Sequence, residues 1–291
     1  MNLLFMTRKL LQAFAFFTVC VFLFTACKKQ KEDDSIPSDG AVKECNDAQS
    51  LWDNALKMAE DALDQNGQMT STKVSSSKIL GCTQAVLKQS ISEGNFIGMI
   101  TIDFGTSYRN TCFDGKTRRG QLIVKYTGRY RDNNTVVQIT TNNYYVNNAK
   151  IEGRRTVRNI GNSVYNVVDS GLDGKGYSKV TAIDGKITTW KSARTRTWSE
   201  GTSTPLDFND DVYIINGNGD GMSSAGDVYT AKAHNIKLKF ACYAVHMYTP
   251  VSGVLTIQSS SGLRFIDYGV GDCDRTALFT SVTGKTYVLN L

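Results

Sequence analysis

The feature that most limits the fold is an alternation of apolar and polar residues that recurs from Lys78 to the end of the chain. Leu122, Val124 and Tyr126 alternate with their neighbours in this way, and a second run from Ile187 to Ser192 does the same. A period of two is typical of half-buried antiparallel strands. Turn residues that tolerate positive φ separate these runs. They are Asn133-Asn134, Asn147-Asn148, Gly161-Asn162, Asp173-Gly174, Asp184-Gly185, Gly219-Asp220-Gly221 and Thr283-Gly284.

Short turns imply that strands adjacent in sequence pair in space. The chain has only 3 prolines, so almost every strand can lie inside a sheet. We expect roughly fourteen strands. The prediction is a mainly β protein, an antiparallel meander that forms a sandwich or a partly open barrel, with a single β domain over residues 78–291.

One amphipathic helix is predicted over residues 45–67, where it would pack on the β domain. Its apolar residues fall at spacings of three and four, with Asn46 or Asp47 available as the N-cap and Gly67 as the stop. They are Ala48, Leu51, Trp52, Ala55, Met58, Ala59 and Ala62.

Two distant segments, 82–112 and 242–273, resemble each other. Each begins with a cysteine, contains a hairpin, and reaches a second cysteine shortly after an Ile-Asp-aromatic-Gly sequence. Cysteines at such matched spacing in an exported protein predict disulfides, here Cys82–Cys112 and Cys242–Cys273. A pairing of Cys112 with Cys273 stays open, and Cys45 has no evident partner. Zinc is disfavoured because the chain lacks spaced CxxC pairs and has only 2 histidines.

The N-terminus has the layout of an export signal. Arg8 and Lys9 precede an apolar run from Leu10 to Ala26, and Cys27 follows Thr25 and Ala26. This resembles the lipobox of bacterial lipoproteins, with Phe24 in place of the usual leucine. We expect residues 1–26 to be a signal peptide and Cys27 to be acylated. The alternative is a transmembrane anchor, but Gln12 interrupts the run and a polar segment follows.

Residues 27–44 are expected to form a flexible tether, because 28–40 is charged and lacks aromatic residues. Its Lys/Glu/Asp-rich start is similar to the surface-export signals of Bacteroidota lipoproteins. We therefore expect a lipoprotein of the outer membrane, at the cell surface or on the periplasmic face. The formal net charge of +6 includes Arg8 and Lys9, and the other basic residues are interspersed with acids, so the sequence does not predict nucleic-acid binding.

Two sequence blocks resemble an uncharacterised family of Bacteroidota lipoproteins that has no assigned activity. The likeness covers about residues 80–291 and implies a single β body. The matching residues are Ile102, Asp103, Phe104, Gly105, Cys112, Asp114, Gly115, Arg118, Arg119 and Gly120, and later Asp267, Tyr268, Gly269, Gly271, Cys273 and Asp274.

Asp103 and Asp267 occupy equivalent places in the two similar segments. As paired carboxylates they could hydrolyse a glycosidic bond if they lay about 5 to 10 Å apart. The preferred interpretation is structural, because an aspartate before a Gly-containing turn usually accepts a backbone N–H. His234 and His246 lie in strand-like runs and are expected to be packed there, so nucleophilic catalysis is not predicted.

Asn216, Asn218, Asp220 and Asp227 have the spacing of oxygen ligands in a calcium loop, with Gly221 at the turn position. The flanking residues read as strands and not helices, so a plain Asn/Gly hairpin loop is the preferred interpretation. No other cofactor is predicted.

Aromatic residues interleaved with polar ones, chiefly Trp190, Trp198, Tyr144 and Tyr145, are candidates for stacking on sugar rings. Packing within the sheet is the preferred interpretation, and Trp190 and Trp198 are expected to share a strand face. The functional hypothesis is a lipid-anchored envelope protein without catalytic activity that binds a glycan or a protein. The alternatives are a polysaccharide hydrolase and a carrier of an apolar ligand.

Overall fold

The computed structural model describes residues 40–66, 73–76, 82, 85–91, 94–107, 111–204, 207, 209–245, 247 and 249–291. The predicted signal peptide, Cys27, most of the predicted tether, Gly67 and His246 lie outside these ranges. The described residues belong to one compact unit, Pro37–Leu291. None of the helices among them is both long enough and apolar enough to cross a membrane.

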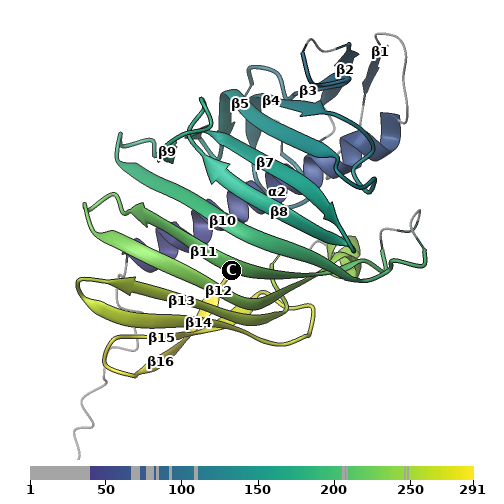
Figure 1. Ribbon diagram of the computed structural model, residues 1–291. Coiled ribbons are helices and arrows are strands. Elements are labelled where there is room, and N and C mark those ends of the chain that lie inside the picture. The colour runs from purple at the N-terminus through teal and green to yellow at the C-terminus, as the bar shows by residue number, and fades with distance from the viewer. Residues whose placement is uncertain are drawn as a thin grey trace, which may run out of the picture. The chain divides into compact units, whose positions relative to one another are not determined.

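The described elements are one α-helix, one 3-10 helix and sixteen strands (Figure 1). They are α2 (Gly40–Asn66), β1 (Lys73–Ser76), β2 (Val86–Ser90), β3 (Gly98–Asp103), β4 (Arg118–Tyr126), β5 (Val136–Val146), β6 (Ala149–Glu152), β7 (Arg154–Gly161), β8 (Val164–Ser170), β9 (Ser178–Thr181), β10 (Ile187–Glu200), β11 (Val212–Met222), β12 (Val228–Lys239), η2 (Phe240–Val245), β13 (Ser252–Ser259), β14 (Gly262–Val270), β15 (Thr276–Thr280) and β16 (Thr286–Asn290).

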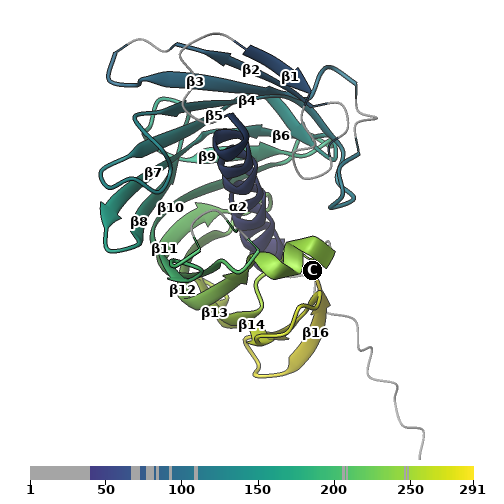
Figure 2. The ribbon, with the colours of Figure 1, turned by 90° about the vertical axis from the view of Figure 1, so that its right-hand side faces the viewer.

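All strands of the described residues belong to one antiparallel sheet that follows the chain as a meander. Between β5 and β10 the sheet splits into two pairs of short strands. β6 and β9 form one pair, and β7 and β8 form the other. The first part of β5 pairs with β7 and its last part with β6, while β10 pairs with β9 near its start and with β8 further along. The predicted mainly β fold with one N-terminal helix is confirmed, and the sheet is a single continuous layer that curves around α2 (Figure 2).

The hydrophobic core lies between α2 and the concave face of the sheet. Ala48, Trp52, Ala55 and Met58 of the helix are at most 2% exposed. The predicted alternation on β4 is confirmed, since Leu122, Val124 and Tyr126 are all buried against this core. Burying one large aliphatic or aromatic side chain stabilises a fold by about 1.5 to 3 kcal/mol, so this face is the main source of stability.

The helix begins at Gly40, earlier than the predicted start at residue 45. Ala41, Val42 and Cys45 are buried and extend the apolar stripe by one more turn, so residues 40–44 are helical and not part of a tether. Asn46 and Asp47 lie inside the helix and do not cap it. Asn46 Oδ1 instead accepts a hydrogen bond from Tyr268 Oη at 2.7 Å, and Asp47 pairs with Lys43 at 2.6 Å.

Most of the predicted turns are present. Asn134, Asn147, Asn148, Asn162, Gly174, Gly185 and Gly284 all have positive φ. The predicted turn at Gly219-Asp220-Gly221 is wrong, because these residues lie within β11 and pair with both β10 and β12. The chain turns instead at Ser223–Asp227, where the amide of Gly226 donates to the carbonyl of Ser223.

Candidate functional site

Both predicted disulfides are present, and each closes one of the two similar segments. Cys82 is bonded to Cys112, and Cys242 of η2 is bonded to Cys273. Each loop contains one hairpin, β2–β3 in the first and β13–β14 in the second. Cys45 is a buried free thiol, and burial raises its pKa to about 12. It therefore stays protonated and unreactive in the folded protein.

Asp103 and Asp267 have the predicted structural role. Asp103 Oδ1 accepts the amide of Gly105 and Asp267 Oδ1 accepts the amide of Gly269, each at 2.9 Å. Both glycines have positive φ. The two aspartates lie on β3 and β14, which are at opposite ends of the sheet in Figures 1 and 2. The structure does not bring them together as a carboxylate pair.

Three of the four candidate stacking aromatics are buried and cannot meet a ligand from solution. Trp190, Trp198 and Tyr144 are 2%, 7% and 3% exposed and face the core, as the preferred interpretation of packing within the sheet predicts, and the two tryptophans share one strand face. Tyr145 is half-buried, and the Arg119 guanidinium lies 3.3 Å from its ring centroid. These four residues therefore do not form an aromatic platform.

The proposed calcium ligands and the alternative hairpin loop are both wrong for residues 216–221. Asn216, Asn218 and Asp220 lie on the outer face of β11, and Asp220 accepts a hydrogen bond from Tyr177 Oη at 2.5 Å. Among the described residues there is no cluster of three His, Cys, Asp or Glu that could hold a metal. The glycines of this segment serve packing, because a Cβ on Gly219 would lie 2.3 Å from the Trp190 ring.

His234 lies on β12, as its sequence context predicts, but its side chain is exposed and not packed.

The sequence did not reveal a buried charged network between α2 and the sheet. Asp169, on β8, accepts two hydrogen bonds from Arg155 at 2.6 and 2.9 Å, and others from Arg194 and Ser192. Arg155 also reaches Asp53 of the helix at 2.7 Å. Burial alone would raise the pKa of Asp169, but the two arginines and these hydrogen bonds lower it to about 2. The carboxylate is therefore charged at neutral pH.

A second buried pair fixes the far half of the helix. Glu60 of α2 binds Arg196 of β10, and Arg196 also donates to Tyr130 Oη at 2.7 Å. Near the start of the helix, Glu44 accepts hydrogen bonds from Thr188 and Ser224 at 2.6 Å each. The helix thus occupies the concave face along its length, where an apolar ligand carried inside the sheet would have to lie.

A cleft lies between the first turns of α2 and the neighbouring edge of the sheet. Its volume is about 570 Å³, within the range of about 300 to 1,000 Å³ typical of ligand pockets. The helix forms one side, and the β5–β6 turn with β9 and the β9–β10 turn forms the other. Val146, Ala149, Val180 and Ala182 supply small apolar surface. The charged lining residues are Lys43, Glu44, Asp47, Lys116, Asp184 and Lys186.

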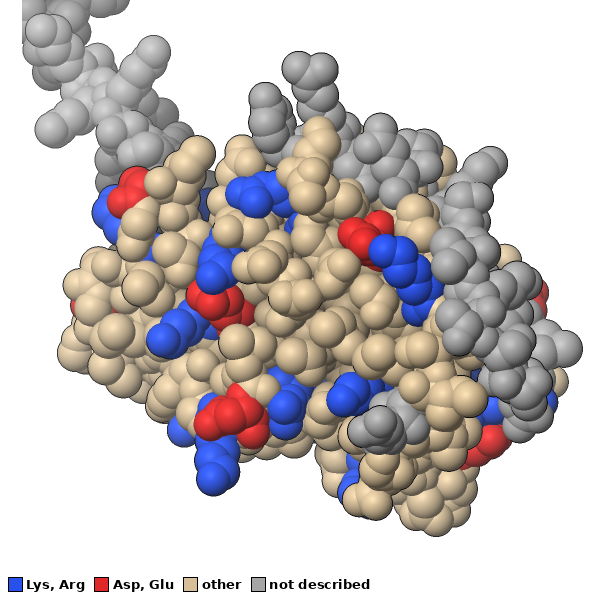
Figure 3. All heavy atoms as spheres, turned by 90° about the horizontal axis from the view of Figure 1, so that it is seen from above, with Lys and Arg blue, Asp and Glu red and all other residues tan. Residues whose placement is uncertain are grey.

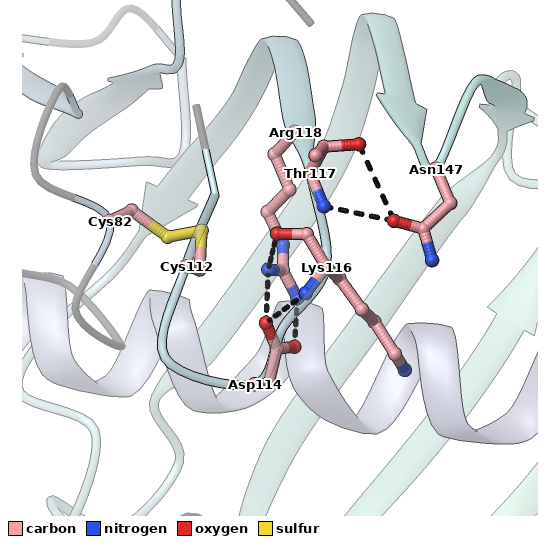
Figure 4. Close-up of a disulfide and its surroundings, with 7 residues drawn as sticks. All are labelled: Cys82, Cys112, Asp114, Lys116, Thr117, Arg118 and Asn147. Carbon is pink, nitrogen blue, oxygen red and sulfur yellow. Dashed lines mark hydrogen bonds and ion pairs between the residues drawn. A yellow bond between two sulfur atoms is a disulfide. The ribbon is translucent and has the colours of Figure 1, made fainter. Parts of the chain in front are cut away.

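Lys116 enters this cleft from the short turn that follows Cys112 and leads into β4 (Figure 4). The turn is held firmly at its base, where Asp114 and Arg118 form a buried two-bond ion pair at 2.8 and 2.6 Å. The amide of Lys116 donates to Asp114 Oδ1 at 3.1 Å, and the amide of Thr117 donates to Asn147 Oδ1 at 2.9 Å. The Lys116 side chain extends away from Arg118 toward α2 in Figure 4.

Burial lowers the pKa of Lys116, and the charges of Asp114 and Asp47 offset this effect only in part. A lysine with a lowered pKa at the wall of a cleft marks a candidate binding site. The sequence could not single out Lys116, because Lys43, Lys116 and Lys186 are far apart in the chain and only the fold brings them to one cleft. The chemistry that the cleft offers is recognition through hydrogen bonds, one ammonium group and small apolar contacts.

On the face shown in Figure 3, basic and acidic side chains are interspersed without a large patch of either sign. Recognition of a charged ligand therefore depends on local groups and not on a long-range field at this face. Comparison with protein-family models, curated proteins and solved structures finds no match to this chain.

Proposed function

We propose that this chain is an exported, lipid-anchored binding protein of the bacterial outer membrane, at the cell surface or on its periplasmic face. Its ligand is a glycan or a protein segment of the envelope, and the protein holds it without chemical conversion. The export signal and Cys27 support the address, and the two disulfides fit an oxidising compartment. The family resemblance agrees with the address and carries no activity.

The observation that carries the binding role is the cleft of about 570 Å³ beside α2. It is polar at its mouth and lined by small apolar side chains, so it accommodates one or two units of a polymer. The hydrolase alternative rested on Asp103 and Asp267, which the sheet separates. The carrier alternative requires space on the concave face, which α2 occupies.

A cleft-filling variant tests this proposal. The full-length lipoprotein in detergent is screened against an array of bacterial and dietary glycans and against envelope protein extracts, and hits are measured by calorimetry. Ala182→Trp places a large side chain in the cleft, while Thr202→Trp adds one to an exposed loop away from it. We expect Ala182→Trp to weaken binding by about tenfold or more, which is a loss of about 1.4 kcal/mol. Equal binding by both variants would place the ligand elsewhere.

A further inference from the structure

We infer that the cleft binds a sugar unit that bears a carboxylate, with the ammonium group of Lys116 as the recognition group for that carboxylate. This inference rests on the proposed function, because it names the ligand class of the same cleft. It is carried by the placement of three lysines in one cleft, of which two have a carboxylate partner and one does not.

The other two lysines each have a carboxylate partner. Lys43 Nζ lies 2.6 Å from Asp47, and Lys186 Nζ lies 3.0 Å from Asp184. Glu44, the third acid of the lining, already accepts from Thr188 and Ser224. Within the described part of the chain Lys116 Nζ has neither a hydrogen bond nor an ion pair, although its side chain is half-buried. It is the cationic group of the lining that remains open to a ligand.

The position of Lys116 is fixed before any ligand arrives. Its carbonyl accepts the amide of Cys112 at 3.0 Å, and its amide is held by Asp114. Asp114 is itself locked by Arg118, and the disulfide fixes Cys112, four residues before Lys116. A fixed backbone at Lys116 reduces the conformational entropy that is lost on binding, which favours affinity. Partial burial lowers the pKa of Lys116, and an anion beside it would reverse that shift.

Lys116 supplies one unpaired positive charge to the cleft. A single charge favours a carboxylate over a phosphate. A phosphate carries up to two charges and is typically bound by Arg or by several donors. The nearby guanidinium, Arg118, is only 1% exposed and is bound to Asp114.

A sugar fits the rest of the lining. The side-chain amide of Asn147 and the hydroxyl of Ser50 are suited to hydroxyl groups, and Val146, Ala149 and Val180 to the C–H face of a ring.

The test uses the full-length lipoprotein in detergent. The probes are tetrasaccharides of galacturonate, mannuronate, guluronate and glucuronate, each with its carboxyl-reduced neutral counterpart, together with inorganic phosphate and a sugar phosphate. Lys116→Gln removes the recognition group, and Lys232→Gln, which removes an exposed lysine of β12 outside the cleft lining, is the matched control. An unchanged unfolding temperature of each variant shows that the fold is retained.

We expect at least one uronate to bind the wild type and Lys232→Gln alike, and Lys116→Gln to bind it about tenfold or more weakly. The carboxyl-reduced counterpart should bind the wild type about tenfold or more weakly than the uronate does. Equal binding of acidic and reduced sugars, preference for a phosphate, or full affinity of Lys116→Gln would overturn this inference. In those cases, loss of ligand binding in Ala182→Trp would still support the proposed function of the cleft. If Ala182→Trp bound the ligand as the wild type does, the proposed function would be wrong as well. If none of the uronates binds, the inference is wrong.

Discussion

At the scale of single residues, the most consequential feature is a set of charges inside the core. Arg155 is 0% exposed and Asp169 is 1% exposed, and both lie between the sheet and α2. A buried ion pair adds little net stability over an apolar pair, but the loss of one partner leaves an unpaired buried charge. These residues therefore tie the helix to one position, since any shift of Asp53 would break the contact with Arg155.

The first prediction concerns Asp169→Asn. We expect the free energy of unfolding at pH 7 to fall by about 3 to 5 kcal/mol, because Arg155 and Arg194 lose their shared carboxylate. Urea unfolding followed by circular dichroism measures it. Lys150→Ala is the control, because its ion pair with Glu152 is solvent-exposed and should leave the midpoint unchanged. Equal effects of the two substitutions would show that the buried network is unimportant.

The effect of Asp169→Asn on the free energy of unfolding depends on pH, because protonation of Asp169 is linked to folding. The pKa of Asp169 is lowered to about 2 in the folded protein, below its usual value of 3.8. Its stabilisation is therefore complete above about pH 4 and is lost as the pH falls towards 2. Burial raises the pKa of Asp211 to about 6, so that group destabilises the fold as the pH rises from 4 to 6. The difference between wild type and Asp169→Asn isolates the first effect and should shrink below pH 4.

At the scale of elements, β11 shows why a motif can mislead. Its glycines alternate with Asn and Asp, which placed oxygen ligands at calcium-loop spacing. In the structure the glycines face the concave side, where Gly219 lies under Trp190 and Gly221 under Tyr229. The polar residues between them face outward. The pattern is thus a strand that makes room for two large rings.

The second prediction tests this role with Gly219→Ala. The added Cβ would lie 2.3 Å from Trp190, so the ring must move. We expect a loss of about 1 to 3 kcal/mol in the free energy of unfolding, measured by urea denaturation. Asn218→Ala, on the exposed face of the same strand, should be close to neutral. Calcium should not change the unfolding temperature of the wild type, and a rise with calcium would contradict our account of this segment.

The sequence predicted the strands, most turns, both disulfides and the helix, because these depend on local periodicity and on cysteine spacing. It did not predict the buried arginines, although a signal was present. Trp190 and Trp198 share the buried face of β10. Arg194 and Arg196 lie an even number of residues from both, so they must lie on the same face and be buried too. Charged side chains are usually exposed, so periodicity alone does not place an arginine in a core. The cleft could not be predicted, because it combines five segments that only the sheet topology brings together.

At the scale of the whole molecule, the proposed attachment to the membrane is covalent, through a lipid on Cys27. In the sequence, a short and mostly polar segment separates Cys27 from α2.

The third prediction is that the mature protein starts at Cys27 and carries a diacylglycerol thioether there. Mass spectrometry of the N-terminal peptide and incorporation of labelled palmitate should show it in the wild type. Cys27→Ala should lose the label and retain residues 1–26, because the lipoprotein peptidase requires the acylated cysteine. Cys45→Ala, which removes the buried thiol, should keep the label. A labelled Cys27→Ala protein would rule out this anchor.

The hydrogen bond between Asn46 and Tyr268 joins residues separated by 222 positions. The helix precedes the described strands in the chain. It contacts β3 and β5, but its contacts with β10 and β14 wait for later parts of the chain. Topologies dominated by such distant pairings fold slowly, because a long loop must close before the contacts form. Part of the apolar stripe of α2 would therefore stay uncovered until the last quarter of the chain arrived, and along the proposed export route periplasmic chaperones would shield it from aggregation.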